Sequence, residues 1–144
     1  MKKLLPLAEK NGWNLLLPEF RGGNLKRNPK CMDACGSHKA KQDIIDAVDY
    51  VRQHYEIDEN NIFLLGASGG GHMALLMAAY APVLWRAVGA FVPVVDLFRW
   101  HAENQNYREE LEACCGGAPT AKTAKSYEYR SPIYYASEIA KANV

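Results

Sequence analysis

The sequence predicts an α/β fold, in which a mostly parallel sheet is covered by helices on both faces. Three short apolar runs alternate with helical segments along the 144 residues, and this alternation is typical of parallel sheets. The runs are continuously apolar, as strands buried on both faces require. The second run ends in a glycine-rich turn that leads directly into a helix. No domain boundary is visible, so we expect a single domain over residues 1–144.

The first quarter of the chain is expected to hold one helix end, one strand and one long loop. Residues 2–10 resemble the end of a short helix. Residues 13–17 (WNLLL) lie between Asn11-Gly12 and Pro18 and suit a buried strand. Residues 19–37 are rich in Gly, Asn, Pro and Lys, and so long a connection indicates a functional role or a short helix of its own.

A long amphipathic helix is predicted over residues 38–55, with Ser37 as its N-cap. Its apolar side chains recur at steps of three and four residues: Ile44, Val48, Val51 and Tyr55. This spacing gives one apolar face toward a core.

The next segments form a strand–helix–strand unit. Residues 61–65 are expected to be a strand, and residues 69–81 a helix that Pro82 ends. This helix is apolar almost all round, which indicates burial between layers. Residues 87–95 (AVGAFVPVV) are the third predicted strand.

The last third of the chain is expected to be helical. Residues 96–115 are polar with helical tendency, and residues 116–119 (GGAP) break the pattern. A final helix is predicted over residues 132–142, with Ser131 as its cap and Pro132 in its first turn.

Composition excludes several classes of partner. The net charge is +1, which gives no basic surface for nucleic acid. No apolar run is long enough to span a membrane. The N-terminus begins with two lysines, but Glu9 and Lys10 leave too short an apolar stretch for a signal peptide. We therefore expect a cytoplasmic protein that binds neither nucleic acid nor a membrane.

Four cysteines are expected to be reduced thiols in loops or in the core: Cys31, Cys35, Cys114 and Cys115. Without a secretion signal their even number does not imply disulfides. Cys31, Cys35 and His38 faintly resemble metal ligands, but the pattern lacks a clear second half. We expect no metal and no cofactor.

The pattern Gly66-x-Ser68-x-Gly70 identifies a candidate nucleophile, because a strand precedes it and a helix follows it. Such a turn is so sharp that the serine adopts a strained conformation with its hydroxyl raised at the carboxyl end of the sheet. Small residues at 66 and 70 let the strand and the helix approach. The N–H of Gly69 begins the helix and is positioned to stabilise an oxyanion.

Two other interpretations of the turn stay open. A dinucleotide-binding turn would need a second glycine where Ser68 stands, and an acidic residue about 20 positions on, whereas the first candidate is Asp96. The turn is otherwise purely structural. A nucleophile also needs a base and an acid, and none of the four histidines, His38, His54, His72 and His101, is well placed for that role. His101 alone is expected near the carboxyl edge of the sheet, and Asp96 is expected to cap the following helix.

Four segments in the same order resemble the catalytic domain of the prolyl oligopeptidase family of serine peptidases, which has the α/β-hydrolase fold. They are residues 16–23 (LLPEFRGG), residues 42–51 (QDIIDAVDYV), residues 57–74 with the elbow GASGGGHMA, and Arg130-Ser131-Pro132. The resemblance covers most of residues 12–140. It implies that Ser68 is the nucleophile and that the Gly69 N–H is one oxyanion donor.

The resemblance also implies that catalytic parts are missing from this chain. In the family the Asp and then the His follow the strand after the Arg-Ser-Pro segment, so both are expected beyond Val144. The other oxyanion donors are expected before residue 13. One strand of the family's sheet would lie between residues 13–17 and 61–65, and its loss leaves open edges that favour aggregation or self-association.

The expected function is therefore a serine hydrolase, peptidase or esterase, that acts through an acyl-serine intermediate and lacks two triad members in this chain. The alternatives are a dinucleotide-binding α/β domain and a non-catalytic remnant of the same fold. Residues 97–117 are expected to be a solvated helix pair rather than a lid over the site. The sequence does not distinguish peptide from ester substrates.

Overall fold

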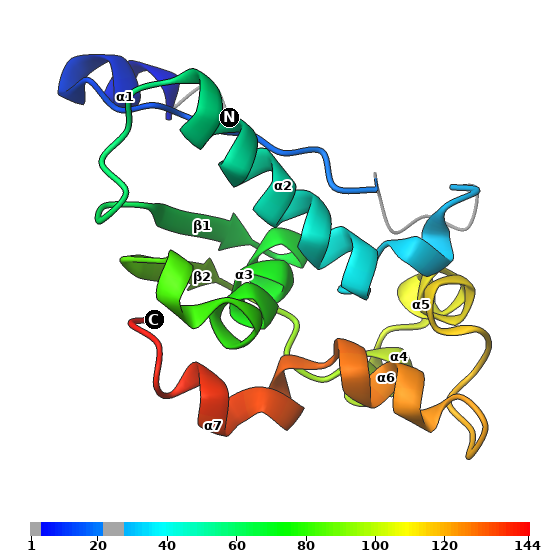
Figure 1. Ribbon diagram of the computed structural model, residues 1–144. Helices are drawn as coiled ribbons and strands as arrows, with labels where there is room; N and C mark the ends of the chain where they lie inside the picture. Colours follow the sequence, from blue (N-terminus) through cyan, green and yellow to red (C-terminus); the bar gives the residue numbers. More distant parts are fainter. Residues whose placement is uncertain (1–3, 22–27) are drawn as a thin grey trace.

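The structure is a computed structural model that describes residues 4–21 and 28–144 (Figure 1). The described residues form two strands, β1 (Phe63–Ala67) and β2 (Ala87–Phe91). The described residues contain these α-helices: α1 (Leu5–Asn11), α2 (His38–His54), α3 (Gly69–Tyr80), α4 (Leu97–Glu103), α5 (Arg108–Cys115), α6 (Ala124–Arg130) and α7 (Ala136–Ile139). Short 3-10 turns occupy Cys31–Asp33, Pro82–Leu84, Gln105–Tyr107 and Pro132–Tyr135.

The strands β1 and β2 pair in parallel, and α3 forms the crossover between them. Leu64 lies opposite Val88 in this register, and both side chains pack in the main core. Because α3 contacts both strands and also packs against α2 and α7, most of its side chains are buried. The predicted unit of strand, buried helix and parallel strand is confirmed.

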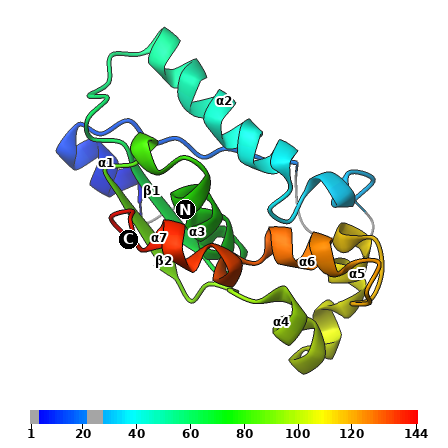
Figure 2. The ribbon, with the colours of Figure 1, turned by 60° about the horizontal axis from the view of Figure 1, so that its bottom comes forward.

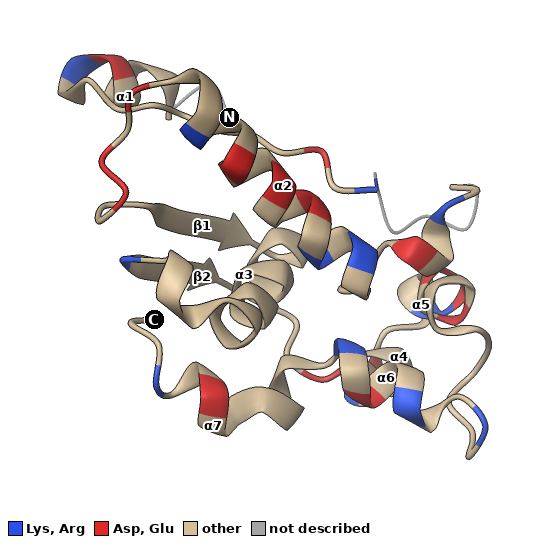
Figure 3. Ribbon diagram, in the orientation of Figure 1, with Lys and Arg blue, Asp and Glu red and all other residues tan. Residues whose placement is uncertain are grey.

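The helix α2 begins and ends close to the predicted limits. Ser37 Oγ accepts a hydrogen bond from the Ala40 N–H at 3.1 Å, which confirms the predicted N-cap. Ile44 and Val48 face the core. Figure 3 shows that acidic residues recur along α2.

The opposite face of the sheet is exposed, contrary to the expectation that helices cover both faces. Phe63 and Leu65 are each 60% exposed and Phe91 is 61% exposed. Leu65 pairs with Gly89, so these side chains share the face away from α3. Within the described residues, β1 and β2 pair only with each other, and no further strand extends the sheet.

The predicted strand over residues 13–17 is wrong. These residues have no assigned secondary structure, and all five side chains are exposed. Trp13 is 61% exposed and Leu17 is 52% exposed. An apolar run becomes a strand only when a neighbouring strand takes up its backbone hydrogen bonds, and the described residues supply none beside it. The third strand is also shorter than predicted, because it ends at Phe91 and Val92 has a left-handed φ of 43°.

A second core cluster lies among α4, α5, α6 and the loop before α2. Figures 1 and 2 show α4, α5 and α6 gathered at one end of the molecule, away from the body of the sheet. The buried side chains of this second cluster are Cys35, Leu97, Leu111, Cys114, Cys115 and Tyr127. The predicted helical tendency of residues 96–115 is confirmed, because this segment forms α4 and α5. The two helices are separated by the 3-10 turn Gln105–Tyr107.

Two details of the C-terminal third differ from the prediction. The helix α6 was not predicted, and the single helix expected over residues 132–142 is a 3-10 turn followed by the four-residue α7. Ser131 does not cap this turn with its side chain. Its hydroxyl instead accepts from the Leu97 N–H at 2.9 Å and donates to the Tyr127 carbonyl at 2.8 Å, so it joins α4 to α6.

Among the described residues, none of the helices has both the length and the apolar character needed to cross a bilayer.

Candidate active site

Ser68 occupies a strained turn between β1 and α3. Its φ of 53° and ψ of −118° lie in a region that a serine rarely adopts. The Ser68 N–H donates to the Phe91 carbonyl at 2.9 Å, and the Ser68 carbonyl accepts from the His72 N–H at 2.9 Å. The strand β2 and the helix α3 therefore hold the backbone of Ser68, while the residue itself stays exposed.

The turn is tight because two glycines let backbones meet. A Cβ at Gly66 would strike the Gly70 carbonyl, and one at Gly71 would lie 2.9 Å from the Phe91 carbonyl. A Cβ at Gly70 would meet nothing within 4 Å. The expectation that the side chain at position 70 must be small for the strand and the helix to approach is therefore wrong. It is the backbone of Gly70 that lies against Gly66. Gly71, which the pattern did not mark, is the glycine that packs against β2.

Gly69 is the first residue of α3, and a Cβ there would meet nothing within 4 Å. The N–H groups of the first turn of a helix have no partner within the helix, and the helix dipole adds positive potential at this end. The exposed Ser68 thus lies at an electropositive helix terminus. This arrangement can stabilise an anion that forms on a substrate oxygen beside Ser68.

All four histidines are engaged by other groups, so none within the described residues is hydrogen-bonded to Ser68. His38 Nδ1 lies 3.3 Å from the Tyr80 hydroxyl, and His54 Nδ1 lies 2.7 Å from the Tyr50 carbonyl. His101 Nε2 lies 2.8 Å from Glu112 Oε1, which turns it toward α5. His72 is bound within the core. The structure does not bring His101 together with Ser68.

His72 is 3% exposed, and its Nε2 donates to the Arg130 carbonyl at 2.6 Å. Because a carbonyl can only accept, the Nε2 carries a proton. Burial lowers the pKa of His72 to about 4, against the raising effect of that hydrogen bond. At neutral pH His72 is therefore an uncharged structural residue that joins the first turn of α3 to the end of α6.

Arg130 is the centre of a buried network that sequence reasoning missed. Its Nη1 donates to the carbonyls of Ala34 at 2.6 Å and Cys35 at 3.0 Å, and its Nη2 donates to the Met32 carbonyl at 2.8 Å. The guanidinium thereby fixes the loop before α2, while the carbonyl of the same residue holds His72. The only feature of the sequence that drew attention to Arg130 was the resemblance of the Arg-Ser-Pro segment to the prolyl oligopeptidase family.

Lys41 adds a second buried cation near Arg130. It is 3% exposed, and its Nζ lies 4.0 Å from the ring centre of Tyr129, 5.1 Å from that of Tyr80 and 6.0 Å from that of Tyr135. Burial, and to a smaller extent the charge of Arg130, lowers the pKa of Lys41 to about 8. The aromatic faces offset part of the cost of burying the charge.

Asp96 caps α4, as the sequence predicts. Its Oδ1 accepts from the N–H groups of Phe98 at 2.9 Å and Arg99 at 3.1 Å. These bonds occupy the carboxylate with helix capping, so Asp96 does not orient a catalytic histidine in this structure.

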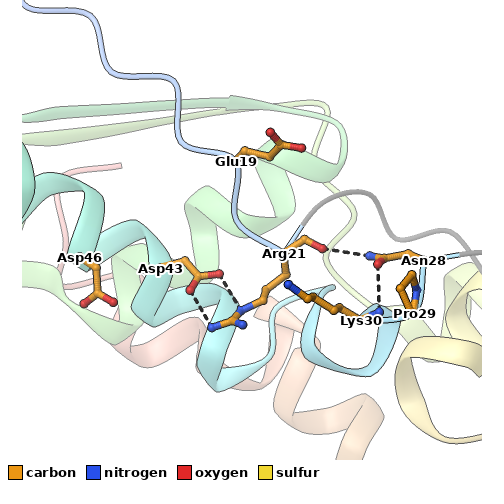
Figure 4. Close-up of a pocket in the computed structure, with 7 residues that line it drawn as sticks. All are labelled: Glu19, Arg21, Asn28, Pro29, Lys30, Asp43 and Asp46. Carbon is orange, nitrogen blue, oxygen red and sulfur yellow. Dashed lines mark hydrogen bonds and ion pairs between the residues drawn. The ribbon is translucent and has the colours of Figure 1, made fainter.

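The described residues also form a hollow of about 620 Å³, and Ser68 is not among the residues that line it (Figure 4). It is lined by Glu19, Arg21, Asn28, Pro29, Lys30, Asp43 and Asp46. Arg21 makes two bonds to Asp43, with Nη2 2.9 Å from Oδ1 and Nε 2.8 Å from Oδ2. Gly22 and Gly23 of the Arg-Gly-Gly loop lie outside the described residues.

No group of three or more potential metal ligands is found within the described part of the chain. The cysteines are free thiols, three of them buried and Cys31 partly exposed. Two of the buried thiols lie on α5 and one lies on the loop before α2.

Comparison with known proteins places the chain in a family. Residues 5–143 match the prolyl oligopeptidase family. Acylamino-acid-releasing enzyme 1 of Oryza sativa subsp. japonica is 25% identical over 95% of this chain, which corresponds to 19% of that enzyme. Uncharacterized peptidase YtmA of Bacillus subtilis (strain 168) is 25% identical over 69% of this chain and 38% of that protein.

The chain thus spans well under half the length of either relative. The family match covers nearly all of its residues and agrees with the parallel strands and the glycine-rich turn at Ser68. The chain belongs to the prolyl oligopeptidase family, and its fold is that of the α/β-hydrolase catalytic domain.

Proposed function

We propose that this chain is the nucleophile-bearing part of a serine peptidase-type hydrolase, and that Ser68 attacks the substrate carbonyl. The observation that carries the proposal is the positive φ of Ser68 at the strand–helix turn. Strain of this kind is found at functional sites, and Ser68 lies exposed immediately before the first turn of α3.

The chemistry follows from that position. Ser68 Oγ forms a bond to the carbonyl carbon, and the developing oxyanion accepts a hydrogen bond from the Gly69 N–H. Collapse of this intermediate expels the amine or alcohol and leaves an acyl-serine, which water then hydrolyses. A base must take the Ser68 proton and return it to the leaving group.

We infer that this base and its acid come from sequence outside these residues. Each of the four histidines has another partner in the described residues, and Asp96 is occupied by helix capping. Residues 1–144 would then be one incomplete catalytic domain. Because loss of triad members leaves only residual catalysis, this chain alone is expected to turn over little or no substrate.

The substrate class is proposed to be a peptide or an ester. The name of the rice relative states that it releases acylamino acids, so N-acetyl-alanine p-nitroanilide is the peptide-type probe to test first, with p-nitrophenyl acetate as the ester probe. The native polypeptide, isolated from its source, is compared with the 144-residue chain. We expect turnover by the native polypeptide, loss of it in Ser68→Ala, and little turnover by the chain.

Three outcomes would count against this proposal. Turnover that survives Ser68→Ala would remove Ser68 from the mechanism. Saturable binding of NADH at micromolar concentration, followed by tryptophan quenching, would favour the dinucleotide interpretation of the glycine turn instead. A native polypeptide without any activity would favour a non-catalytic remnant.

We further propose that the isolated chain self-associates through its open sheet. Phe63, Leu65 and Phe91 are at least 60% exposed on one face, and exposed apolar patches beside unpaired strand edges favour association. Light scattering after size-exclusion chromatography should give a mass above that of one chain, which Leu65→Lys lowers. Val83→Lys is the matched control, because Val83 is 99% exposed and lies outside the sheet. A monodisperse monomer that melts cooperatively would contradict this.

The cytoplasm remains the proposed location. Fractionation of the source cells tests it, and recovery of the native polypeptide in a membrane or secreted fraction would contradict it.

A further inference from the structure

The first turn of α3 has no side chain of its own that could hold it in place. Gly69, Gly70 and Gly71 open the helix, and His72 is its first residue with a side chain. Glycine disfavours a helix because its backbone loses the most conformational freedom on folding. The turn that carries the Gly69 N–H therefore has little intrinsic preference for the helical conformation.

His72 anchors this turn to the interior of the protein. Its backbone N–H closes the turn by donating to the Ser68 carbonyl at 2.9 Å. The residue is 3% exposed, and its ring Nε2 donates to the Arg130 carbonyl at 2.6 Å. A Cβ at Gly36 would lie 3.2 Å from His72 Cε1, so the loop before α2 approaches the same ring. One side chain thus fastens the turn after Ser68 to α6 and to this loop.

The carbonyl that accepts from His72 is itself held in place. The Arg130 guanidinium donates to three carbonyls of the loop before α2 at 2.6 to 3.0 Å. The next residue, Ser131, accepts from the Leu97 N–H at 2.9 Å and donates to the Tyr127 carbonyl at 2.8 Å. The carbonyl between these two bonded side chains is a fixed point to which the ring of His72 is attached.

We propose that His72 is a positioning residue for the reaction at Ser68: its buried ring orders the glycine turn, so that the Gly69 N–H is directed at the oxyanion. This role rests on the proposed hydrolase function. A donor stabilises the transition state most when it needs no reorientation as charge develops on the substrate oxygen. The ring acts through the backbone of α3 and exchanges no proton with Ser68 or with the substrate.

The test compares His72→Leu with His72→Gln in the native polypeptide, with N-acetyl-alanine p-nitroanilide and p-nitrophenyl acetate as substrates. Leucine fills the space but removes the donor to the Arg130 carbonyl, whereas glutamine keeps a donor. For His72→Leu we expect kcat to fall roughly 10- to 100-fold while KM changes by less than about threefold. For His72→Gln we expect kcat to stay within about threefold of wild type.

Two controls separate positioning from stability. Each kcat is divided by the concentration of sites that a fluorophosphonate labels to completion, and rates are measured below the onset of melting. Leu111→Ala is the matched variant, because Leu111 is 6% exposed on α5 in the second core cluster, whereas α3 packs in the main core. Its truncation destabilises the protein, but its kcat per labelled site should equal that of wild type.

His72→Asn replaces His72→Leu if circular dichroism shows that the leucine variant does not fold. Asparagine keeps an amide donor, but its shorter side chain does not reach the Arg130 carbonyl. The same fall in kcat at unchanged KM is expected, and glutamine should again restore kcat.

The outcomes distinguish this inference from the function on which it rests. Wild type without turnover, or turnover that survives Ser68→Ala, would remove the proposed function and this role of His72 with it. Turnover that is lost in Ser68→Ala but unchanged per labelled site in His72→Leu or His72→Asn would overturn the positioning role alone. So would a loss of kcat in His72→Gln or in Leu111→Ala as large as that in His72→Leu.

Discussion

The imidazole of His72 donates to the carbonyl of Arg130 across 2.6 Å, and so joins α3, which begins directly after Ser68, to the end of α6. His72 lies one turn after Ser68. In this arrangement it does not act as the base for Ser68, because its Nε2 is hydrogen-bonded to a carbonyl. The same Arg130 holds the loop before α2 through its guanidinium. A buried, uncharged histidine therefore anchors the first turn of α3, which follows Ser68, to the end of α6.

This contact predicts an acid-sensitive fold. Burial lowers the pKa of His72 from an ordinary 6.5 to about 4, so between these values the unfolded chain binds more protons than the folded chain. The free energy of unfolding should then fall by about 2 kcal/mol between pH 7 and pH 4.5 because of His72 alone. Urea denaturation of wild type and His72→Gln isolates this part, because Gln keeps a donor but does not titrate. An equal pH dependence in both proteins would refute the role assigned to His72.

Lys41 predicts a gain of stability in alkali, a pH dependence of the same sign as that of His72. Burial lowers its pKa from 10.5 to about 8, so above pH 8 the folded chain loses its proton before the unfolded chain does. The wild type should gain about 2 kcal/mol relative to Lys41→Met between pH 7.5 and pH 9.5. Denaturation of both proteins at several pH values in this window measures the difference, because the other titrating side chains are common to both. A constant difference would show that the Lys41 amine is not buried among the tyrosine rings.

The glycines of the turn separate close contact from helix propensity. Gly66→Ala and Gly71→Ala place a Cβ against backbone atoms and should destabilise the fold by roughly 2–4 kcal/mol. Gly70→Ala is the matched control, because its Cβ enters open space and alanine favours the helix; its effect should stay within about 1 kcal/mol. Thermal melting of the three variants gives the ranking, and a cost at Gly70 equal to that at Gly66 would be inconsistent with the geometry of the turn.

Arg130 predicts a large loss of stability from a single buried side chain. Arg130→Met removes the guanidinium donors from the carbonyls of Met32, Ala34 and Cys35, at a cost of roughly 3 kcal/mol or more. Arg99→Ala is the control, since Arg99 pairs with Glu103 on an exposed face of α4, where such pairs contribute about 0.5 kcal/mol. Equal melting temperatures for the two variants would exclude the network as a support of the fold.

The parts of this fold that were predictable are those with local causes. Ser37 caps α2 with its own hydroxyl, Asp96 caps α4 in the same way, and the glycine-rich turn at Ser68 forms between an apolar strand and an apolar helix. Each of these follows from neighbouring residues, which the sequence presents together.

The parts that were not predictable depend on distant partners. Residues 13–17 have the composition of a strand, but strand formation requires a neighbour that the described residues do not contain. Arg130 reaches carbonyls about a hundred positions earlier, and His72 finds its acceptor 58 positions later. Gly71 matters because Phe91 of the next strand approaches it. None of these relations leaves a local pattern.

The central claim is that Ser68 is a nucleophile in the protein to which this chain belongs. A fluorophosphonate probe reacts with activated serines, and its site of attachment can be mapped by mass spectrometry of peptides from the native polypeptide. We predict one adduct, on Ser68, that is lost in Ser68→Ala and kept in Ser137→Ala, since Ser137 lies exposed on α7. An adduct on another serine, or none on the native polypeptide, would contradict the claim.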